Sequence, residues 1–357
     1  MSIGTIKRSH FFKPIQKRAA EARRPLDVMF ELTYRCNFRC PHCYVEGSKK
    51  RGKELTTRQV FTILDQMREM GVWSVGFTGG EALLRKDIFD ILGYAKRGGF
   101  QTALLSNGYL IDKKTADKLA RANVNNVDIT FNSLKPDIFE KLTGVKNSLK
   151  KAKAAIGLLI KRGVRVEIKS IAMTINRDEL VNISRFARSL NIIHDLDTEI
   201  LPCRNGYTAS VDSYSLNSDE VEATHRTVYP EMFHLVGRKI SCLMRKRDRM
   251  FNCGVGRSLF SITPYGKMNF CIEINYPECS LLKYGVSRCW EKIKEEVDRL
   301  NKTPDFVCES CDLVKYCGWC AGRSYMETGI FNKCSEYFKK RAIETKERRM
   351  PEWTEKR

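Results

Sequence analysis

Long uncharged hydrophobic runs are absent from this sequence. Hydrophobic residues make up 42% of the 357-residue chain, yet no window approaches the roughly 18 apolar residues that a membrane helix requires. The segment before Pro25 is basic, and it lacks the apolar stretch and small-residue cleavage site of a secretory signal. These absences predict a cytoplasmic protein with no membrane partner.

Acidic residues and histidines are also few. The chain has 42 Asp and Glu against 63 Lys and Arg, a formal net charge of +21, and its five histidines form no recognisable catalytic set. Such an excess suits a nucleic acid, an acidic peptide or a small anionic substrate. No aromatic residues interleave with the basic runs to stack on bases, so a nucleic-acid partner is unlikely on this pattern.

Cysteine, in contrast, is abundant, with 14 residues. A reducing cytoplasm does not favour structural disulfides, and cysteines at short spacings there are more often metal ligands. The cysteine content therefore makes metal binding the first hypothesis.

The chain from residue 28 to 202 alternates short β-rich runs with longer segments of helical period, the pattern of repeated βα units. Such alternation predicts a parallel sheet, either open and doubly wound or closed into a complete or partial barrel. After about residue 210 the pattern gives way to short segments crowded with Cys, Gly and aromatics, which predicts a cysteine-stapled domain with little core of its own. The expected strands are 28–33, 72–78, 101–106, 126–131, 165–173 and 195–201.

Three cysteines, Cys36, Cys40 and Cys43, follow the first expected strand in the segment TYRCNFRCPHCY. Spacings of four and three within one loop can place three thiolates around one metal site. With no fourth cysteine nearby, one iron of a cubane would stay open. A zinc site completed by His42 is the alternative, but His42 stands between two of the ligands and would have to bend back.

The run CNFRCPHC resembles the CxxxCxφC motif of the radical S-adenosylmethionine (SAM) superfamily, where φ is an aromatic residue and His42 takes its place. The resemblance implies a partial (β/α)6 barrel of the TIM type. It also implies that SAM chelates the open iron of a 4Fe-4S cluster, and that reductive cleavage yields a 5'-deoxyadenosyl radical. The protein's own contribution would be geometry and electrostatics.

Further motifs stand where this family would place its SAM contacts, at the carboxyl ends of strands. Gly79, Gly80 and Glu81 resemble the GGE motif that holds the methionine amino group, although Ala82 replaces the usual proline. Asn107 lies in an SNG turn similar to the common TNG turn. Ser133, beside Asn132, would contact the ribose, and Lys169 would face the SAM carboxylate.

The C-terminal cysteines follow the order C-x12-G-x4-C, C-x2-C-x5-C-x2-C and a final C. This order resembles the SPASM domain, an auxiliary-cluster extension of radical SAM peptide maturases, whose last pair is usually spaced x3. A zinc ribbon is the alternative. The resemblance implies one or two auxiliary 4Fe-4S clusters: an outer cluster on Cys308, Cys311, Cys317 and Cys334, and an inner cluster on Cys253, Cys271 and Cys320.

Four cysteines remain unassigned: Cys203, Cys242, Cys279 and Cys289. Cys242 and Cys279 are the nearest candidates for the fourth ligand of the inner cluster, unless that iron is open and binds substrate. Burial as a small apolar side chain would explain the others.

The resulting domain prediction is a basic extension (1–24), a radical SAM barrel (25–210), a linking helical segment (211–240), a SPASM-like domain (241–340) and a charged tail (341–357). The expected function is maturation of a peptide or protein by hydrogen abstraction, giving a crosslink, a thioether or an oxidised residue, with auxiliary clusters accepting an electron. The expected partners are a peptide or protein substrate, where the basic patches would suit an acidic leader peptide, and a reductant such as flavodoxin or ferredoxin. Only 35 residues precede Cys36, too few for the recognition domain of many such maturases, so a separate recognition protein or a substrate that is not a leader-type peptide is left open.

Two other functions remain open from the sequence. One is radical modification of a small anionic molecule, such as oxidative decarboxylation of a tetrapyrrole. The other is a non-catalytic protein that binds zinc and nucleic acid. No general acid or base can be named.

Overall fold

The computed structural model describes residues 14–45, 52–204, 208–230, 249–303, 308 and 310–354. Its centre is one curved sheet of nine strands in the order β6-β5-β4-β3-β2-β1-β7-β8-β9. The first six strands pair in parallel with their sequence neighbours, which confirms the predicted partial barrel. They are β1 (Asp27–Thr33), β2 (Ser74–Gly79), β3 (Gln101–Ser106), β4 (Asn126–Thr130), β5 (Val166–Ile171) and β6 (Ile193–Asp197).

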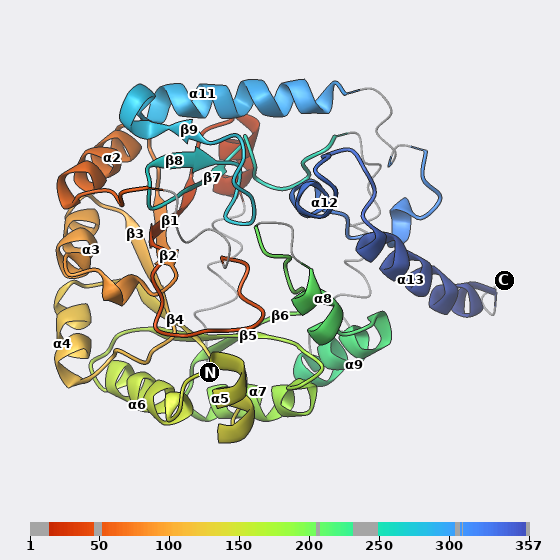
Figure 1. The fold of residues 1–357 in the computed structure, drawn as a ribbon, viewed down its shortest axis with the longest axis horizontal. Coiled ribbons are helices and arrows are strands. Elements are labelled where there is room, and N and C mark those ends of the chain that lie inside the picture. The colour runs from red at the N-terminus through yellow and green to blue at the C-terminus, as the bar shows by residue number, and fades with distance from the viewer. Residues whose placement is uncertain are drawn as a thin grey trace.

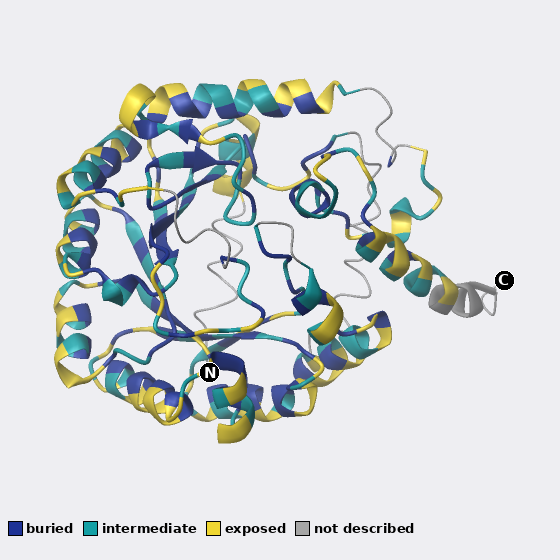
Figure 2. Ribbon diagram, in the orientation of Figure 1, coloured by how far each residue is buried: buried dark blue, intermediate teal, exposed yellow. Residues whose placement is uncertain are grey.

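Helices pack along the outside of the six parallel strands and turn their buried faces toward them (Figures 1 and 2). In the first of these, a capping box between Thr56 and Gln59 fixes the start, and Val60, Leu64 and Met67 line the buried face. The helices are α2 (Thr57–Glu69), α3 (Ile88–Arg97), α4 (Lys113–Arg121), α5 (Pro136–Thr143), α6 (Ser148–Ile160) and α7 (Leu180–Ser189). Because the strands are parallel, the loops that follow β1, β2 and β3 emerge at one edge of the sheet.

The C-terminal region continues this sheet. Strand β7 (Leu259–Ile262) pairs in parallel with β1, and β8 (Lys267–Asn269) and β9 (Cys279–Ser280) add antiparallel. Phe260 of β7 and Trp290 belong to the same buried cluster as Phe30 of β1. Strands β7–β9 thus share the core of the barrel and do not form a core of their own.

The remaining helices are distributed from the β9 end of the sheet to the β6 end (Figure 1). Helix α11 (Leu281–Asn301) runs along β9 and packs on α2, while the charged tail forms α13. The others are α8 (Ala209–Tyr214), α9 (Ser218–Val228), α12 (Ala321–Thr328) and α13 (Glu336–Thr354). No helix in the described ranges is both long and apolar enough to cross a membrane.

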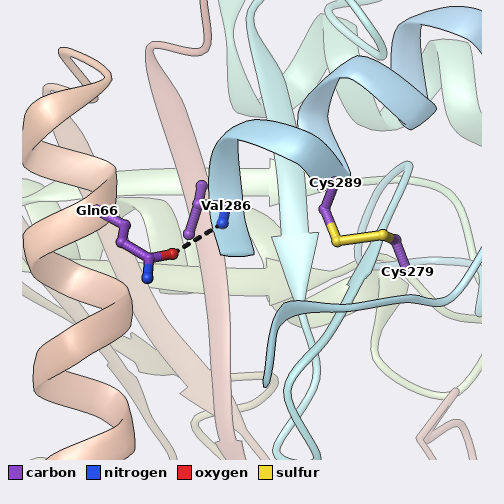
Figure 3. The surroundings of a disulfide bond; sticks show 4 residues. All are labelled: Gln66, Cys279, Val286 and Cys289. Atoms are coloured by element: carbon purple, nitrogen blue, oxygen red, sulfur yellow. Dashed lines mark hydrogen bonds between the residues drawn. A yellow bond between two sulfur atoms is a disulfide. The ribbon is translucent and has the colours of Figure 1, made fainter. Parts of the chain in front are cut away.

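A disulfide joins Cys279 at β9 to Cys289 on α11 (Figure 3). Beside it, Gly285 takes the left-handed region (φ 73°) and breaks the helix, and the side chain of Gln66 caps the restarted helix by accepting from the Val286 N–H at 2.8 Å. A sulfur bonded to another sulfur is not a thiolate ligand. Cys279 is therefore excluded as the fourth cluster ligand in this structure, and Cys242 lies outside the described residues.

Candidate functional site

The loop that carries Cys36, Cys40 and Cys43 begins where β1 ends. Two backbone hydrogen bonds hold this loop: Arg39 N–H donates to the Thr143 carbonyl at 2.9 Å, and Cys43 N–H donates to the Cys40 carbonyl at 3.2 Å. The buried thiol of Cys203 donates to the Cys43 carbonyl at 3.3 Å. Cys203 thus has a specific contact with this loop, beyond its burial as a small apolar side chain.

Gly79 and Gly80 hold this loop against the end of β2. The N–H of Gly80 donates to the Thr33 carbonyl, and the N–H of Glu81 donates to the Arg35 carbonyl, each at 2.8 Å. A β-carbon at Gly79 would come within 2.1 Å of Thr33 O, and one at Gly80 within 2.4 Å of Arg35 O. Only glycine fits at these two positions, so the pair fixes the distance between the cysteine loop and β2.

The Glu81 carboxylate is fully buried and ties the end of β2 to the turn after β3. It accepts hydrogen bonds from Ser106 Oγ, from Asn107 N–H at 2.8 Å and from Leu83 N–H at 3.1 Å. Burial raises its pKa, and these hydrogen bonds oppose that rise. The carboxylate therefore positions the turn after β3, and the contact of the GGE motif with the SAM amino group stays a prediction.

Asn107 lies directly beside the first cysteine. Its side-chain amide donates to Asn37 Oδ1 at 2.8 Å and lies 4.0 Å from Cys36 Sγ. The structure thus brings together the cysteine loop, the GGE motif and the SNG turn, as the sequence predicted from their strand ends.

Ser133 and Lys169 are engaged elsewhere. Ser133 is fully buried, and its hydroxyl accepts from Lys135 N–H at 3.0 Å in a local turn before α5. The Lys169 ammonium pairs with Asp195 at 2.8 Å and with Asp128 at 3.5 Å, across β4, β5 and β6. Their contacts with SAM stay predictions.

Two polar atoms next to the cysteines are buried with no hydrogen-bond partner among the described residues: Asn37 Nδ2 and His42 Nδ1. Burial also lowers the pKa of His42 to about 4, so its ring is neutral near pH 7. Three thiols in one rigid loop, with polar groups beside them that still lack partners, fit an iron-sulfur cluster and its ligand.

Arg204, after β6, is a residue that the sequence analysis missed. Its guanidinium is buried, pairs with Glu31 of β1 at 2.9 Å and donates to Tyr34 Oη at 2.8 Å and to the Ile272 carbonyl. Its own N–H donates to the Tyr44 carbonyl at 3.0 Å. Arg204 thus joins β1 and the segment that carries Cys271 through its side chain, and the cysteine loop through its backbone N–H. No motif surrounds Arg204, so only its position after the last barrel strand could have drawn attention to it.

The four cysteines expected to hold the outer cluster line one cavity of about 230 Å³ near the start of α13. They come from three separate segments of the chain, and Trp319 and Leu313 complete the wall. These cysteines are Cys308, Cys311, Cys317 and Cys334.

The three cysteines expected to hold the inner cluster also lie together. Burial raises the pKa of Cys271 well above its usual range, and Glu273, Cys320 and Cys253 add to the rise through their negative charge. The pKa of Cys320 rises to about 12 for the same reasons, burial first and Glu273 second. Thiolates that are ligands of one cluster repel one another when no cation is bound between them, and this repulsion raises the pKa of each thiol.

Among the described residues, no three His, Cys, Asp or Glu side chains are drawn tightly enough to hold a single metal ion. A cubane differs, because each of its thiolates binds a different iron atom.

The Radical SAM superfamily profile matches residues 30–187, which include the cysteine loop, the GGE motif and the strands that carry them. Residues 30–187 therefore form a radical SAM domain. The protein is a radical SAM enzyme, and its cofactors are a 4Fe-4S cluster and SAM.

Two curated relatives match at lower identity. The PqqA peptide cyclase of Granulibacter bethesdensis is 25% identical over 255 residues, which cover 69% of this chain and 67% of the relative. The subtilosin biosynthesis protein AlbA of Bacillus subtilis is 27% identical over 258 residues, covering 69% of this chain and 55% of AlbA. The matched region thus spans about two thirds of one relative and about half of the other.

Solved structures match over more of the chain and show the fold. Streptococcus suis SuiB, bound to the precursor peptide SuiA, superposes with a TM-score of 0.70 at 17% identity, covering 92% of this chain and 80% of SuiB. The enzyme anSMEcpe, with bound AdoMet, gives 0.66 at 17% identity and covers 92% of this chain and 98% of its own. Both comparisons extend beyond the barrel into the cysteine-rich C-terminal region.

Proposed function

We propose that this radical SAM enzyme modifies a peptide or protein. Cys36, Cys40 and Cys43 hold the SAM-binding cluster, and the C-terminal cysteines hold one or two auxiliary clusters. The observation that carries the proposal is the joint presence of two sites: a three-cysteine loop locked against Gly79 and Gly80, and a second, four-cysteine cavity. Relatives named for peptide cyclisation or solved with a precursor peptide support the substrate class.

When bound, the cluster and SAM supply a 5'-deoxyadenosyl radical after one electron enters from a flavodoxin or ferredoxin. This chemistry would abstract a hydrogen atom from the peptide and give 5'-deoxyadenosine. Auxiliary clusters held by the C-terminal cysteines would accept the electron that is released, with a proton, when the substrate radical is oxidised. The chain's residues fix the loop, as Gly80, Asn107 and Cys203 do.

The proposed partners follow from charge. With +21 at neutral pH, the enzyme attracts an acidic leader peptide, directly or through a separate recognition protein. A cytoplasmic location belongs to this proposal, because such reductants and peptide precursors are available there.

The test is metal content and SAM cleavage after anaerobic reconstitution. We expect roughly eight to twelve irons per chain, falling by about four in the Cys36→Ala/Cys40→Ala/Cys43→Ala variant with loss of 5'-deoxyadenosine, since each cubane carries four irons. Cys279→Ala/Cys289→Ala, which removes two cysteines that are bonded to each other, is the matched control and should keep its iron. Stoichiometric zinc with little iron and no SAM cleavage would overturn the proposal.

The substrate class needs its own experiment. The reconstituted enzyme is incubated with SAM, reductant and precursor peptides encoded beside its gene, and the peptides are analysed by mass spectrometry. A mass loss of two hydrogens that depends on SAM supports peptide modification. Turnover of a tetrapyrrole carboxylate with unchanged peptides would contradict it.

A further inference from the structure

The inner set of cysteines has one ligand fewer than a cubane accepts. Cys253, Cys271 and Cys320 supply three thiolates, and a fully liganded 4Fe-4S cluster takes four ligands. Cys279, one of the two cysteines that the sequence offered for this position, is bonded to Cys289 and is not available as a thiolate ligand. The missing ligand must therefore come from another residue, or the iron stays open.

A tight turn places Glu273 among these cysteines. Cys271 and Ile274 form an isolated antiparallel bridge, so the two residues between them protrude from the turn. The Glu273 carboxylate lies 3.8 Å from Cys320 Sγ and accepts its hydrogen bond. Gly322 packs this turn against α12, since a β-carbon there would be 3.6 Å from Ile274 and 3.7 Å from Cys320 Sγ.

The charge of Glu273 acts on all three thiols. It is the largest electrostatic influence on Cys271 and on Cys320, and it also acts on Cys253. Cys271 and Cys320 are partly buried and Cys253 is exposed, and the Glu273 carboxylate beside Cys320 adds a fourth anionic donor to these thiols. In a cubane, each of the four donors would bind a different iron atom. The arrangement is therefore that of a four-donor anionic set.

The nearby guanidinium of Arg323 does not satisfy this carboxylate. Arg323 is fully buried, pairs with Glu327 through Nε at 2.9 Å and stacks on Tyr337 at 3.4 Å. Its Nη1 and Nη2 atoms have no hydrogen-bond partner in the part of the chain that the structure describes. Within these residues, the hydrogen bond of the Glu273 side chain goes to Cys320.

From this geometry we propose that Glu273 is the fourth ligand of the inner auxiliary cluster, binding iron through its carboxylate beside Cys253, Cys271 and Cys320. The inference rests on the proposed function, because it needs an auxiliary cluster at this site. It assigns the position to an oxygen ligand where the sequence pattern suggested a cysteine or an open iron.

The experiment uses the full chain with the SAM cluster removed by Cys36→Ala/Cys40→Ala/Cys43→Ala, so that the iron measured is auxiliary. Glu273→Gln, Glu273→Cys and Cys242→Ala are added singly to this parent. Glu199→Gln is the matched control, a carboxylate that burial also affects and that shares the electrostatic influence of Arg323. Iron per chain and the Mössbauer and EPR spectra of oxidised and reduced protein are recorded.

We expect Glu273→Gln to lose about one iron per chain and to show a three-iron signal after oxidation, because one corner of the cubane loses its ligand. Glu273→Cys should retain the iron and shift the EPR spectrum toward that of an all-cysteine cluster. Glu199→Gln and Cys242→Ala should match the parent.

Iron and spectra unchanged in Glu273→Gln would overturn the inference, whether or not Cys242→Ala then loses iron. Failure of the proposed function looks different, because the parent itself would then contain no auxiliary iron. Glu273→Cys is the second variant that separates ligation from a folding defect, because it removes the carboxylate but still offers a ligand atom on a shorter side chain.

Discussion

At the scale of single residues, the Arg204 side chain contacts several separate segments near the site. Its side chain is 2% exposed and its partner Glu31 is 1% exposed. Tyr34 and Tyr44 place their rings 5.5 and 5.1 Å from the guanidinium carbon. A buried pair of this kind adds little net stability, but removing one partner leaves an uncompensated charge in the core.

Arg204→Met should therefore lower the free energy of unfolding by about 3–5 kcal/mol, because it leaves Glu31 buried without a cation. The double variant Arg204→Met/Glu31→Leu should recover most of that loss. Urea denaturation of the metal-free protein measures both. A double variant no more stable than Arg204→Met would show that Arg204 acts through its contacts with Tyr34 and Ile272 and not through the charge pair.

The sequence could locate the site but not all of its working contacts. Cys36, Glu81 and Asn107 were found because their motifs follow consecutive strands, and parallel strands bring such loops together. The contacts of Ser133 and Lys169 were not foreseen, because each depends on partners from another segment or on the local turn. Arg204 and Glu273 stand outside any motif, and only tertiary packing brings them to the cysteines.

At the scale of elements, the decisive contact joins the end of β2 to the end of β1. Two backbone hydrogen bonds connect them, and the pair Gly79–Gly80 leaves no room for a side chain. The cysteine loop is thus held by main-chain atoms, whose positions depend little on the identity of neighbouring side chains.

Gly80→Ala tests this contact. Its β-carbon would lie 2.4 Å from Arg35 O, so the loop must shift, which we expect to destabilise the protein by about 1–3 kcal/mol and to abolish loading of the SAM cluster. Iron content and thermal unfolding are measured together. Gly157→Ala on α6, where a β-carbon meets nothing within 4 Å, is the control and should stabilise by about 0.5–1 kcal/mol. Full iron loading in Gly80→Ala would contradict this account.

Helices α5 and α11 show why some helices are difficult to predict from the sequence. Helix α5 begins at Pro136, a good first residue, but it spans only Pro136–Thr143, too short for a clear period. In α11 the break at Gly285 interrupts the apolar pattern, and the neighbouring cysteines resemble a metal-binding segment. The helix forms because Gln66 of α2 caps its restart, a contact across 220 residues.

At the scale of the whole molecule, the barrel and the first C-terminal strands are one folding unit. Strand β7 adds to the β1 edge, and Trp290 of α11 packs on Phe260 at 5.7 Å while donating to the Arg23 carbonyl at 3.1 Å. The predicted boundary between residues 210 and 241 thus marks a change in sequence composition. The sheet continues beyond it, because β7 pairs with β1.

Shared packing predicts a shared unfolding transition. A variant that keeps Trp290 as its single tryptophan should show the same urea midpoint by Trp290 fluorescence and by far-UV circular dichroism, which is dominated by the barrel. The metal-free protein is used, since bound clusters would complicate the equilibrium. A fluorescence midpoint well below the dichroism midpoint would show that α11 and β7–β9 unfold independently.

The Arg204 contacts have a consequence for electron transfer. Cys43 is followed by Tyr44, whose carbonyl accepts from Arg204 N–H, and the Arg204 side chain donates to Ile272, the neighbour of Cys271. Covalent bonds and two hydrogen bonds therefore connect a cysteine of the SAM site with one of the inner auxiliary site. On the proposed assignment this is a continuous tunnelling route through bonded and hydrogen-bonded atoms, and its length is set by the fold.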